Sequence, residues 1–169
     1  KPMLKVGSKP ILESILEQFI SEGFHNFFIS THYKAEIVQD FFGDGSNWNV
    51  SINYVFEESP LGTAGSLGLL PKNLPNLPIL MMNGDLLTKV DFVELLNFHS
   101  QHGGDATMCV REYDYQVPYG VIKSKDHKIV SIEEKPRQHF FVNAGIYVLS
   151  PSILEGLDGK SYIDMPSLI

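Results

Sequence analysis

The chain has 169 residues, of which 43% are hydrophobic and 20% are charged, which is typical of a globular domain with a buried core. Its formal net charge of −7 argues against binding to nucleic acid or to an anionic membrane, because both need a surplus of Lys and Arg on the surface. No apolar run approaches the ~20 residues of a membrane span, and the start of the chain does not resemble a signal peptide.

The single cysteine, Cys109, excludes an internal disulfide framework and lies in the apolar stretch Met-Cys-Val, which is typical of a buried strand. A free thiol fits a reducing environment, so we expect a cytoplasmic protein. The chain has no internal repeat and no linker rich in Pro, Gly or Ser that would divide it. We therefore expect one domain over residues 1–169.

The first part of the chain alternates between helical and extended patterns. A helix is predicted to begin near Pro10, because apolar residues then recur at helical spacing as far as Ile20, and Gly23 follows as a stop signal. The next segments are a strand at 26–31, a helix ending at Gly43, a strand at 50–56, a Gly-rich segment with helix-compatible leucines at 60–70, a strand at 78–83, a helix at 92–102 and a strand at 106–111.

After Tyr119 the pattern changes, because three strand-like stretches at 120–124, 129–134 and 141–149 follow one another without a helix. The earlier alternation of strands and helices implies crossovers that place helices on the faces of a sheet. Continuous apolar runs such as 78–83 suit strands that are buried on both faces. Together these patterns predict an α/β fold, a Rossmann-like three-layer αβα sandwich with a mixed, mainly parallel central sheet.

Two aspartates are candidates for binding a metal ion. Asp85 directly follows the apolar strand at 78–83, and open α/β sheets bind ligands at the carboxyl ends of their strands, although an aspartate in a turn is an equally good interpretation. Asp164 alone favours an N-cap, with Pro166 in the first turn of a helix. Mg²⁺ commonly takes one or two carboxylates plus phosphate oxygens and water, so the pair would suit it if the two side chains met.

Phosphate ligands are the second group of candidates. Residues 60–66 (PLGTAGS) place two glycines before a helix, which lets backbone N–H groups approach a ligand, but a plain loop explains them equally well. Lys135 precedes Pro136 and would hold a phosphate beside Glu134, or else it belongs to a solvated surface cluster. Lys1 also precedes a proline and is a further candidate, although terminal lysines are usually mobile.

Seven segments of the chain resemble, in order, the landmarks of the sugar-phosphate nucleotidylyltransferase family. They are KPMLKVGSKPILE, PLGTAG, NGD, PYGVI, EEKP, VNAGIYVLSP and YIDMP. One such segment would be weak support, but accidental agreement of all seven in order is a poor explanation. PLGTAG and VNAGIYV resemble most the guanylyl-transferring branch, which acts on mannose or amino-sugar phosphates. The resemblance implies transfer of a nucleoside monophosphate from a nucleoside triphosphate, with GTP favoured, to a hexose 1-phosphate.

The resemblance also implies roles for individual residues. Asp85 and Asp164 would bind Mg²⁺, with Asp85 also facing the nucleotide, while Lys1 would neutralise the nucleotide phosphates and Lys135 the sugar phosphate. The remaining implied contacts are Glu57, Gly62 and Thr63 for the base, and Gly120, Glu134, Asn143 and Gly145 for the sugar. An assembly of identical chains is compatible with the resemblance but is not required by it.

One family landmark does not occur in residues 1–169. It is a Gly-rich loop that ends in Gly-Thr-Arg-Leu and precedes the Lys-Pro-Met segment. We expect the loop to be omitted from this sequence rather than lost in evolution, and the C-terminal end to be truncated. Two alternatives stay open: a non-catalytic module that binds nucleotide sugars, and a metal-dependent glycosyltransferase of similar fold. The latter usually has Asp-x-Asp where this chain has Asn83-Gly-Asp85.

Overall fold

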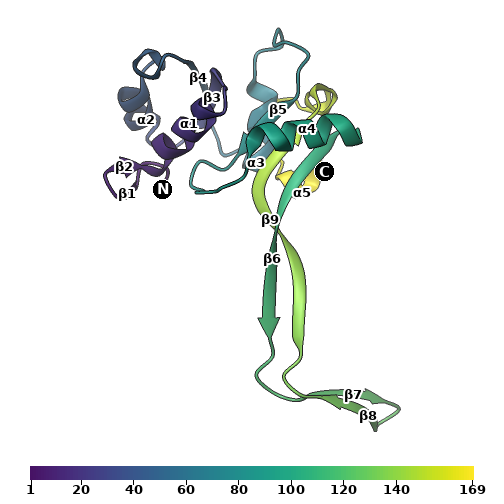
Figure 1. Cartoon of the computed structure of the whole chain (residues 1–169). Helices are drawn as coiled ribbons and strands as arrows, with labels where there is room; N and C mark the ends of the chain where they lie inside the picture. Colours follow the sequence, from purple (N-terminus) through teal and green to yellow (C-terminus); the bar gives the residue numbers. More distant parts are fainter. The chain divides into compact units, whose positions relative to one another are not determined.

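A computed structural model describes all residues from 1 to 169. Residues 1–107 and 147–169 form one compact unit, and residues 108–146 form a second. Strands β6 (Ala106–Gln116) and β9 (Arg137–Leu149) contribute residues to both units. Figure 1 shows the elements along the chain.

The first unit contains all the helices. Its elements before residue 60 are β1 (Lys5–Val6), β2 (Lys9–Pro10), α1 (Ile11–Ser21), β3 (Asn26–Thr31), α2 (Ala35–Phe42), η1 (Ser46–Trp48) and β4 (Ser51–Phe56). The later ones are α3 (Gly62–Gly65), η2 (Ser66–Leu69), β5 (Ile79–Met82), α4 (Phe92–His102), η3 (Pro151–Gly156) and α5 (Met165–Leu168). These bounds confirm the predicted order of helices and strands, and the Gly-rich segment with helix-compatible leucines forms two short helical pieces, α3 and η2.

Strands β3 and β4 form a parallel pair in register from Asn26 opposite Ser51 to Thr31 opposite Phe56. Helix α2 connects the two strands, as parallel pairing requires a crossover. A buried cluster joins α1, α2 and β4 through Leu16, Phe42 and Ile52. Figure 1 shows both helices beside this strand pair. The apolar stripes that predict these helices are therefore the surfaces that they bury.

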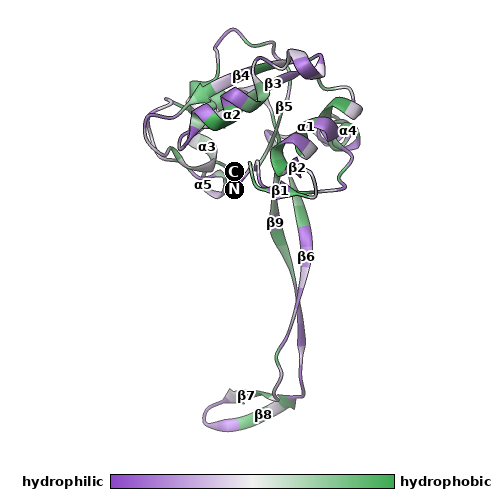
Figure 2. Cartoon of the chain, turned by 90° about the vertical axis from the view of Figure 1, so that its left-hand side faces the viewer, coloured by the Kyte–Doolittle hydropathy of each residue, from purple (hydrophilic) through white to green (hydrophobic).

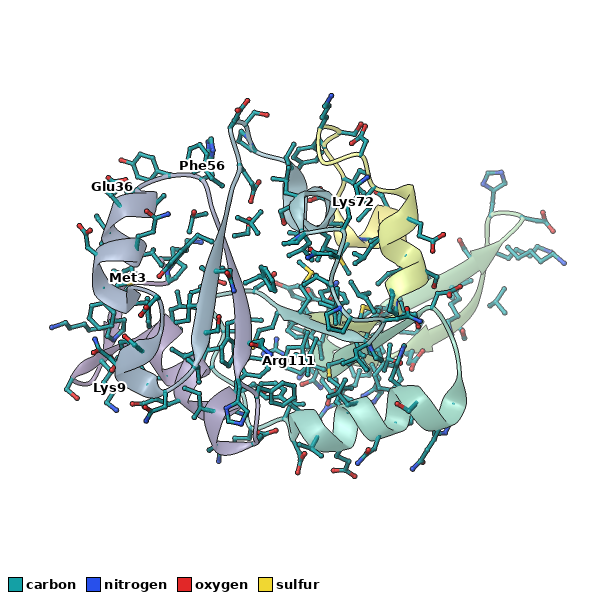
Figure 3. The ribbon with its side chains drawn as sticks, turned by 90° about the horizontal axis from the view of Figure 1, so that it is seen from above. Met3, Lys9, Glu36, Phe56, Lys72 and Arg111 are labelled. Atoms are coloured by element: carbon teal, nitrogen blue, oxygen red, sulfur yellow. The ribbon has the colours of Figure 1, made fainter.

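Strand β9 lies between β5 and β6 in a three-stranded sheet. Tyr147 and Leu149 of β9 pack with Ala64 of α3 and with Met165 of α5 in one buried cluster. Val148, whose side chain alternates with these two, is also fully buried. Figure 3 shows α4 on one side of this sheet and the segments of α3 and η3 on the other, and Figure 2 shows hydrophobic residues on β9 in green.

The strands hydrogen-bond in four groups: β1–β2, β3–β4, β5–β9–β6 and β7–β8. The pair β3–β4 is parallel, whereas β1–β2 and β7–β8 are antiparallel. Helices on both sides of the β5–β9–β6 sheet and mixed strand directions confirm the predicted α/β class. None of the helices is long and apolar enough to span a membrane.

The second unit consists of strands without a helix, as the sequence predicts. β7 (Val121–Lys125) and β8 (Lys128–Glu133) form an antiparallel hairpin with a register shift next to Ser124. The two turn residues, Asp126 and His127, have φ of 50° and 62°. Positive φ at both central positions is the requirement of a type I′ turn, whose twist matches that of the flanking strands. On β6, Cys109 is half-buried, and this burial raises the pKa of its thiol.

Candidate functional site

A cavity of about 530 Å³ lies in the first unit, within the size range of small-molecule sites. Much of its lining is apolar and comes from α1, β3 and β5. Its polar lining includes Ser30 on β3, Glu57 just after β4 and Asn83 just after β5. Each of these residues lies at or beyond the carboxyl end of a strand, which is where open α/β sheets bind ligands.

Glu57 contributes a half-buried carboxylate to this cavity. Its Oε1 accepts a hydrogen bond of 2.6 Å from the hydroxyl of Ser30, and its Oε2 accepts one of 2.9 Å from the backbone N–H of Leu61. The side chain therefore connects the ends of β3 and β4 to the loop that begins at Pro60. Each oxygen keeps a lone pair for a ligand, because a carboxylate offers about four acceptor positions.

Gly62 and Thr63 also line the cavity, and both lie against the segment 161–165. A side chain on Gly62, whose φ is 78°, would place its Cβ 2.5 Å from the carbonyl oxygen of Ile163. The same carbonyl accepts hydrogen bonds from the N–H groups of Ala64, at 2.9 Å, and Gly65, at 3.1 Å. Several backbone N–H groups of the segment 60–66, which could have approached a ligand, thus donate hydrogen bonds within the chain. Gly62, the first glycine of the segment, permits the close approach to Ile163 because it has no side chain.

Asp164 lies beside Thr63. Its Oδ1 accepts hydrogen bonds from the Thr63 N–H at 3.1 Å and from the Thr63 hydroxyl at 3.4 Å, while its Oδ2 accepts one of 3.0 Å from the Tyr162 hydroxyl. The bond from the Thr63 N–H, followed by that from Tyr162, lowers the pKa of the Asp164 carboxyl, so the group is ionised at neutral pH.

The N-cap interpretation of Asp164 holds for its position but not for its side chain. Asp164 is the N-cap residue of α5, yet its side chain makes no capping bond there and instead accepts from Thr63 at the start of α3. Sequence spacing does not reveal this pairing, because the two residues are about 100 positions apart. The bond from the Tyr162 hydroxyl joins residues only two positions apart, but the sequence does not show that the two side chains point toward each other.

Asp85 and Lys1 are both exposed. Gly84, which precedes Asp85, lies close to Pro2, since a Cβ on this glycine would be 3.6 Å from the Pro2 Cγ. The start of the chain therefore lies beside the loop that carries Asp85. No group of three or more His, Cys, Asp or Glu residues is gathered that could hold a metal ion. Asp85 and Asp164, the two candidate metal ligands, therefore do not belong to any such group.

The second unit contains the candidate sugar-binding residues. A Cβ on Gly120 would lie 3.0 Å from Oε2 of Glu134, so the structure brings these two residues together. The side-chain oxygen of Asn143 accepts a hydrogen bond of 2.8 Å from the N–H of Gly145, whose φ is 72°. The first pair therefore lies directly outside the ends of the β7–β8 hairpin, and the second lies on β9.

Lys135 has a left-handed backbone, with φ of 46°. Its N–H donates to the carbonyl of Tyr119 at 3.3 Å, and its own carbonyl accepts from the side chain of Gln116 at 3.2 Å. Such a conformation in a residue other than glycine costs about 1–3 kcal/mol and occurs preferentially at functional sites. The strain is compatible with the predicted role of Lys135 as a phosphate ligand.

The family model described as "Nucleotidyl transferase" matches residues 1–165. The chain belongs to the nucleotidyl transferase family. This match confirms the family predicted from the seven sequence segments, which extend over the same residues.

Curated relatives of this chain carry the name of one branch of the family. A probable mannose-1-phosphate guanylyltransferase of Oryza sativa subsp. japonica is 33% identical over 168 residues, which are 95% of this chain and 46% of the relative. The mannose-1-phosphate guanylyltransferase of Mycobacterium tuberculosis is 32% identical over 160 residues, which are 92% of this chain and 44% of the relative. The chain thus spans about half the length of the curated relatives that it matches.

Solved structures support the fold of this chain. HddC from Yersinia pseudotuberculosis superposes with a TM-score of 0.71 at 26% identity, over 95% of this chain and 72% of that protein. The same protein in complex with GMP-PN has a TM-score of 0.72 at 25% identity, over 96% of this chain and 72% of that protein. The predicted α/β nucleotide-diphospho-sugar transferase fold is confirmed.

Proposed function

We propose that this chain carries the nucleotidyl-transfer site of an enzyme that moves GMP from GTP to a hexose 1-phosphate and releases pyrophosphate. The observation that carries the proposal is the cavity at the strand ends, which gathers Glu57, Gly62 and Thr63 in a member of this family. The names of the relatives, which are mannose-1-phosphate guanylyltransferases, favour guanine as the base and a mannose-type sugar phosphate.

The chain's task in this reaction is alignment and charge neutralisation, because a sugar phosphate oxygen attacks the α-phosphorus in line without a covalent intermediate. Glu57 would pair with the base, and the backbone at Gly62 and Thr63 would lie against the nucleoside. Lys1 would neutralise the nucleotide phosphates. In the second unit, Lys135 would hold the sugar phosphate. The sugar hydroxyls would contact Gly120, Glu134, Asn143 and Gly145.

The proposed cofactor is Mg²⁺, held by Asp85 and Asp164. When bound, the ion would neutralise charge on the nucleotide phosphates and orient them. The ionised Asp164 carboxylate fits this role, since it accepts hydrogen bonds only from uncharged groups and so keeps its full negative charge. A cytoplasmic location is our prediction from the single free cysteine, and an assembly of identical chains is compatible with the family resemblance.

The deciding experiment measures pyrophosphate release by the full-length protein. We expect release only when a nucleoside triphosphate, a hexose 1-phosphate and Mg²⁺ are all present, and we expect Asp85→Asn and Asp164→Asn to abolish it. Ligand binding without turnover would favour the non-catalytic module instead. Pyrophosphate release without the sugar phosphate would show that the reaction is a different one.

A further inference from the structure

Two strand edges of the first unit have no neighbouring strand. Strand β3 pairs only with β4, and β5 is an edge strand of the sheet β5–β9–β6. Consecutive residues of both strands, 26–30 in β3 and 78–84 in and around β5, line the same cavity of about 530 Å³. Successive side chains of a strand point to opposite faces, so a cavity that touches every residue lies at the strand's edge, in the plane of the sheet. The cavity therefore separates the free edge of β3 from the free edge of β5.

The pairing of β3 with β4 determines which backbone groups of β3 face the cavity. The N–H groups at the start of β4 and directly after its end donate to the carbonyls of His25 and Thr31, at 2.9 Å each. Residues that bond to one neighbour alternate along a parallel strand, so the odd-numbered residues of β3 bond to β4. The N–H and carbonyl groups of Phe28 and Ser30 consequently point toward the cavity. A free edge of this kind is a template for pairing with a further strand.

Apolar side chains cover this gap on both faces of the sheet. Phe27 packs against the buried cluster that contains Leu16 of α1, whereas Phe28, which points to the opposite face, lines a smaller pocket with Leu69 of η2. The uninterrupted apolar run Ile79–Met82 of β5 is typical of a strand buried on both faces, yet each of its residues is only half-buried. Strand β5 therefore lacks a neighbour that its sequence suits.

We propose that the gap between β3 and β5 receives a further strand, supplied by the segment of this protein that directly precedes Lys1. The position of the chain start favours this occupant. A Cβ on Gly84, just beyond the carboxyl end of β5, would lie 3.6 Å from Pro2 and 3.5 Å from Leu12 at the beginning of α1. A strand that ends at Lys1 would thus leave the gap beside α1, and α1 would be its crossover to β3, which makes the two strands parallel.

The added strand would join β4, β3, β5, β9 and β6 into one sheet. Because helices cover the gap on both faces, we expect the segment before Lys1 to be apolar at consecutive positions, as β5 is. The strand would occupy the apolar part of the cavity, while Glu57, Gly62 and Thr63 would remain beyond the strand ends and open to a ligand. The inference does not rest on the proposed reaction.

The test measures amide hydrogen exchange in the full-length protein by nuclear magnetic resonance. The N–H groups of Phe27 and Ile29, which face β4, are matched controls within the same strand. If the gap holds a strand, the N–H groups of Phe28 and Ser30 should exchange at rates within roughly tenfold of these controls. Faster exchange than this at Phe28 and Ser30 would show an open edge and would overturn the proposal.

Nuclear Overhauser effects in the same sample identify the occupant. We expect the amide protons of Phe28 and Ser30 to show contacts with residues that precede Lys1. Contacts with another part of the protein would overturn the assignment, and so would contacts with a second copy, which a sample of mixed isotope labelling distinguishes. Slow exchange without any contact to the preceding segment would also overturn it. None of these readouts depends on turnover, so the result is independent of the pyrophosphate-release experiment.

Discussion

Glu57 and Asp164 each have a carboxylate that accepts hydrogen bonds from within the chain and can still accept from a ligand. Both groups accept hydrogen bonds from backbone N–H groups of the segment 61–63 and from a nearby hydroxyl. These bonds restrict the carboxylates to one orientation before a ligand arrives, which reduces the entropy that binding must overcome. At the scale of the residue, hydrogen bonds from the segment 61–63 therefore preorganise the two candidate carboxylates.

The base preference tests the role of Glu57. Guanine presents its ring N–H and its exocyclic amine side by side, which matches an acceptor-only carboxylate, whereas uracil and thymine would place a carbonyl oxygen against it. We expect turnover with GTP to exceed turnover with UTP or dTTP roughly tenfold to hundredfold, and Glu57→Gln to reduce this ratio. The measurement compares kcat/KM for the common nucleoside triphosphates before and after the substitution.

Two controls separate base recognition from support of the loop. Glu58→Gln changes the exposed neighbouring carboxylate, and Ser30→Ala removes one of the two internal bonds of Glu57 but keeps its charge. Both variants should keep the wild-type ranking of the triphosphates. An unchanged ranking in Glu57→Gln would contradict the proposed contact with the base.

At the scale of the element, α3 and the segment 161–165 behave as one structure. The carbonyl of Ile163 accepts from two N–H groups of α3, and the N–H of Ile163 donates to the carbonyl of Leu61 at 2.8 Å. Further along, a Cβ on Gly68 would lie 2.4 Å from the N–H nitrogen of Gly159. Glycines let the two backbones touch, so the loop that lines the cavity also positions the residue proposed to bind the cation.

Gly62→Ala tests this contact. The Cβ of the new alanine would overlap the Ile163 carbonyl, and the alanine would also have to keep the positive φ of Gly62. We therefore expect the free energy of unfolding to fall by about 1–3 kcal/mol. Gly7→Ala is the matched control, because Gly7 has φ of 68° but no atom within 4 Å of the added Cβ. Denaturant unfolding of both variants gives the comparison. Equal losses would mean that backbone strain alone accounts for the effect and that the close approach contributes nothing.

At the scale of the whole molecule, the first unit depends on a buried polar link between its helices and its sheet. His99 of α4 is 5% exposed and lies 2.8 Å from the Thr107 hydroxyl and 3.1 Å from the Ser150 hydroxyl. The Ser150 hydroxyl donates to the carbonyl of Gly104, so it must accept from the Nε2–H of His99. The other ring nitrogen, Nδ1, lies beside the Thr107 hydroxyl, so both ring nitrogens have a hydrogen-bond partner.

His99→Ala should therefore lower the stability of the protein. Removing the ring leaves the Thr107 hydroxyl without its partner and opens a cavity under α4, and each buried polar group left unpaired costs about 1–3 kcal/mol. His25→Ala, at an exposed histidine, should change the free energy of unfolding by less than about 0.5 kcal/mol. Chemical denaturation measures both. A His99→Ala variant as stable as His25→Ala would show that the link is dispensable.

Much of the fold could be predicted from local patterns. Apolar spacing placed α1 and α4, and continuous apolar runs placed β3 and β5, because burial of one face or of both faces dictates the period of hydrophobic residues. The order of motifs was enough to predict the family. These properties depend on residues that are close together along the chain, so the sequence alone determined them.

The partners of the site residues were decided only by the tertiary structure. The pairing of Thr63 with Asp164, the use of Gly62 for contact with Ile163 and the bond from Tyr162 to Oδ2 join or orient groups through packing. The number of ways in which distant residues can meet grows with chain length, and only close packing of the whole core selects one of them. The sequence therefore determined which chemical groups are present, and the folded core decided which of them touch.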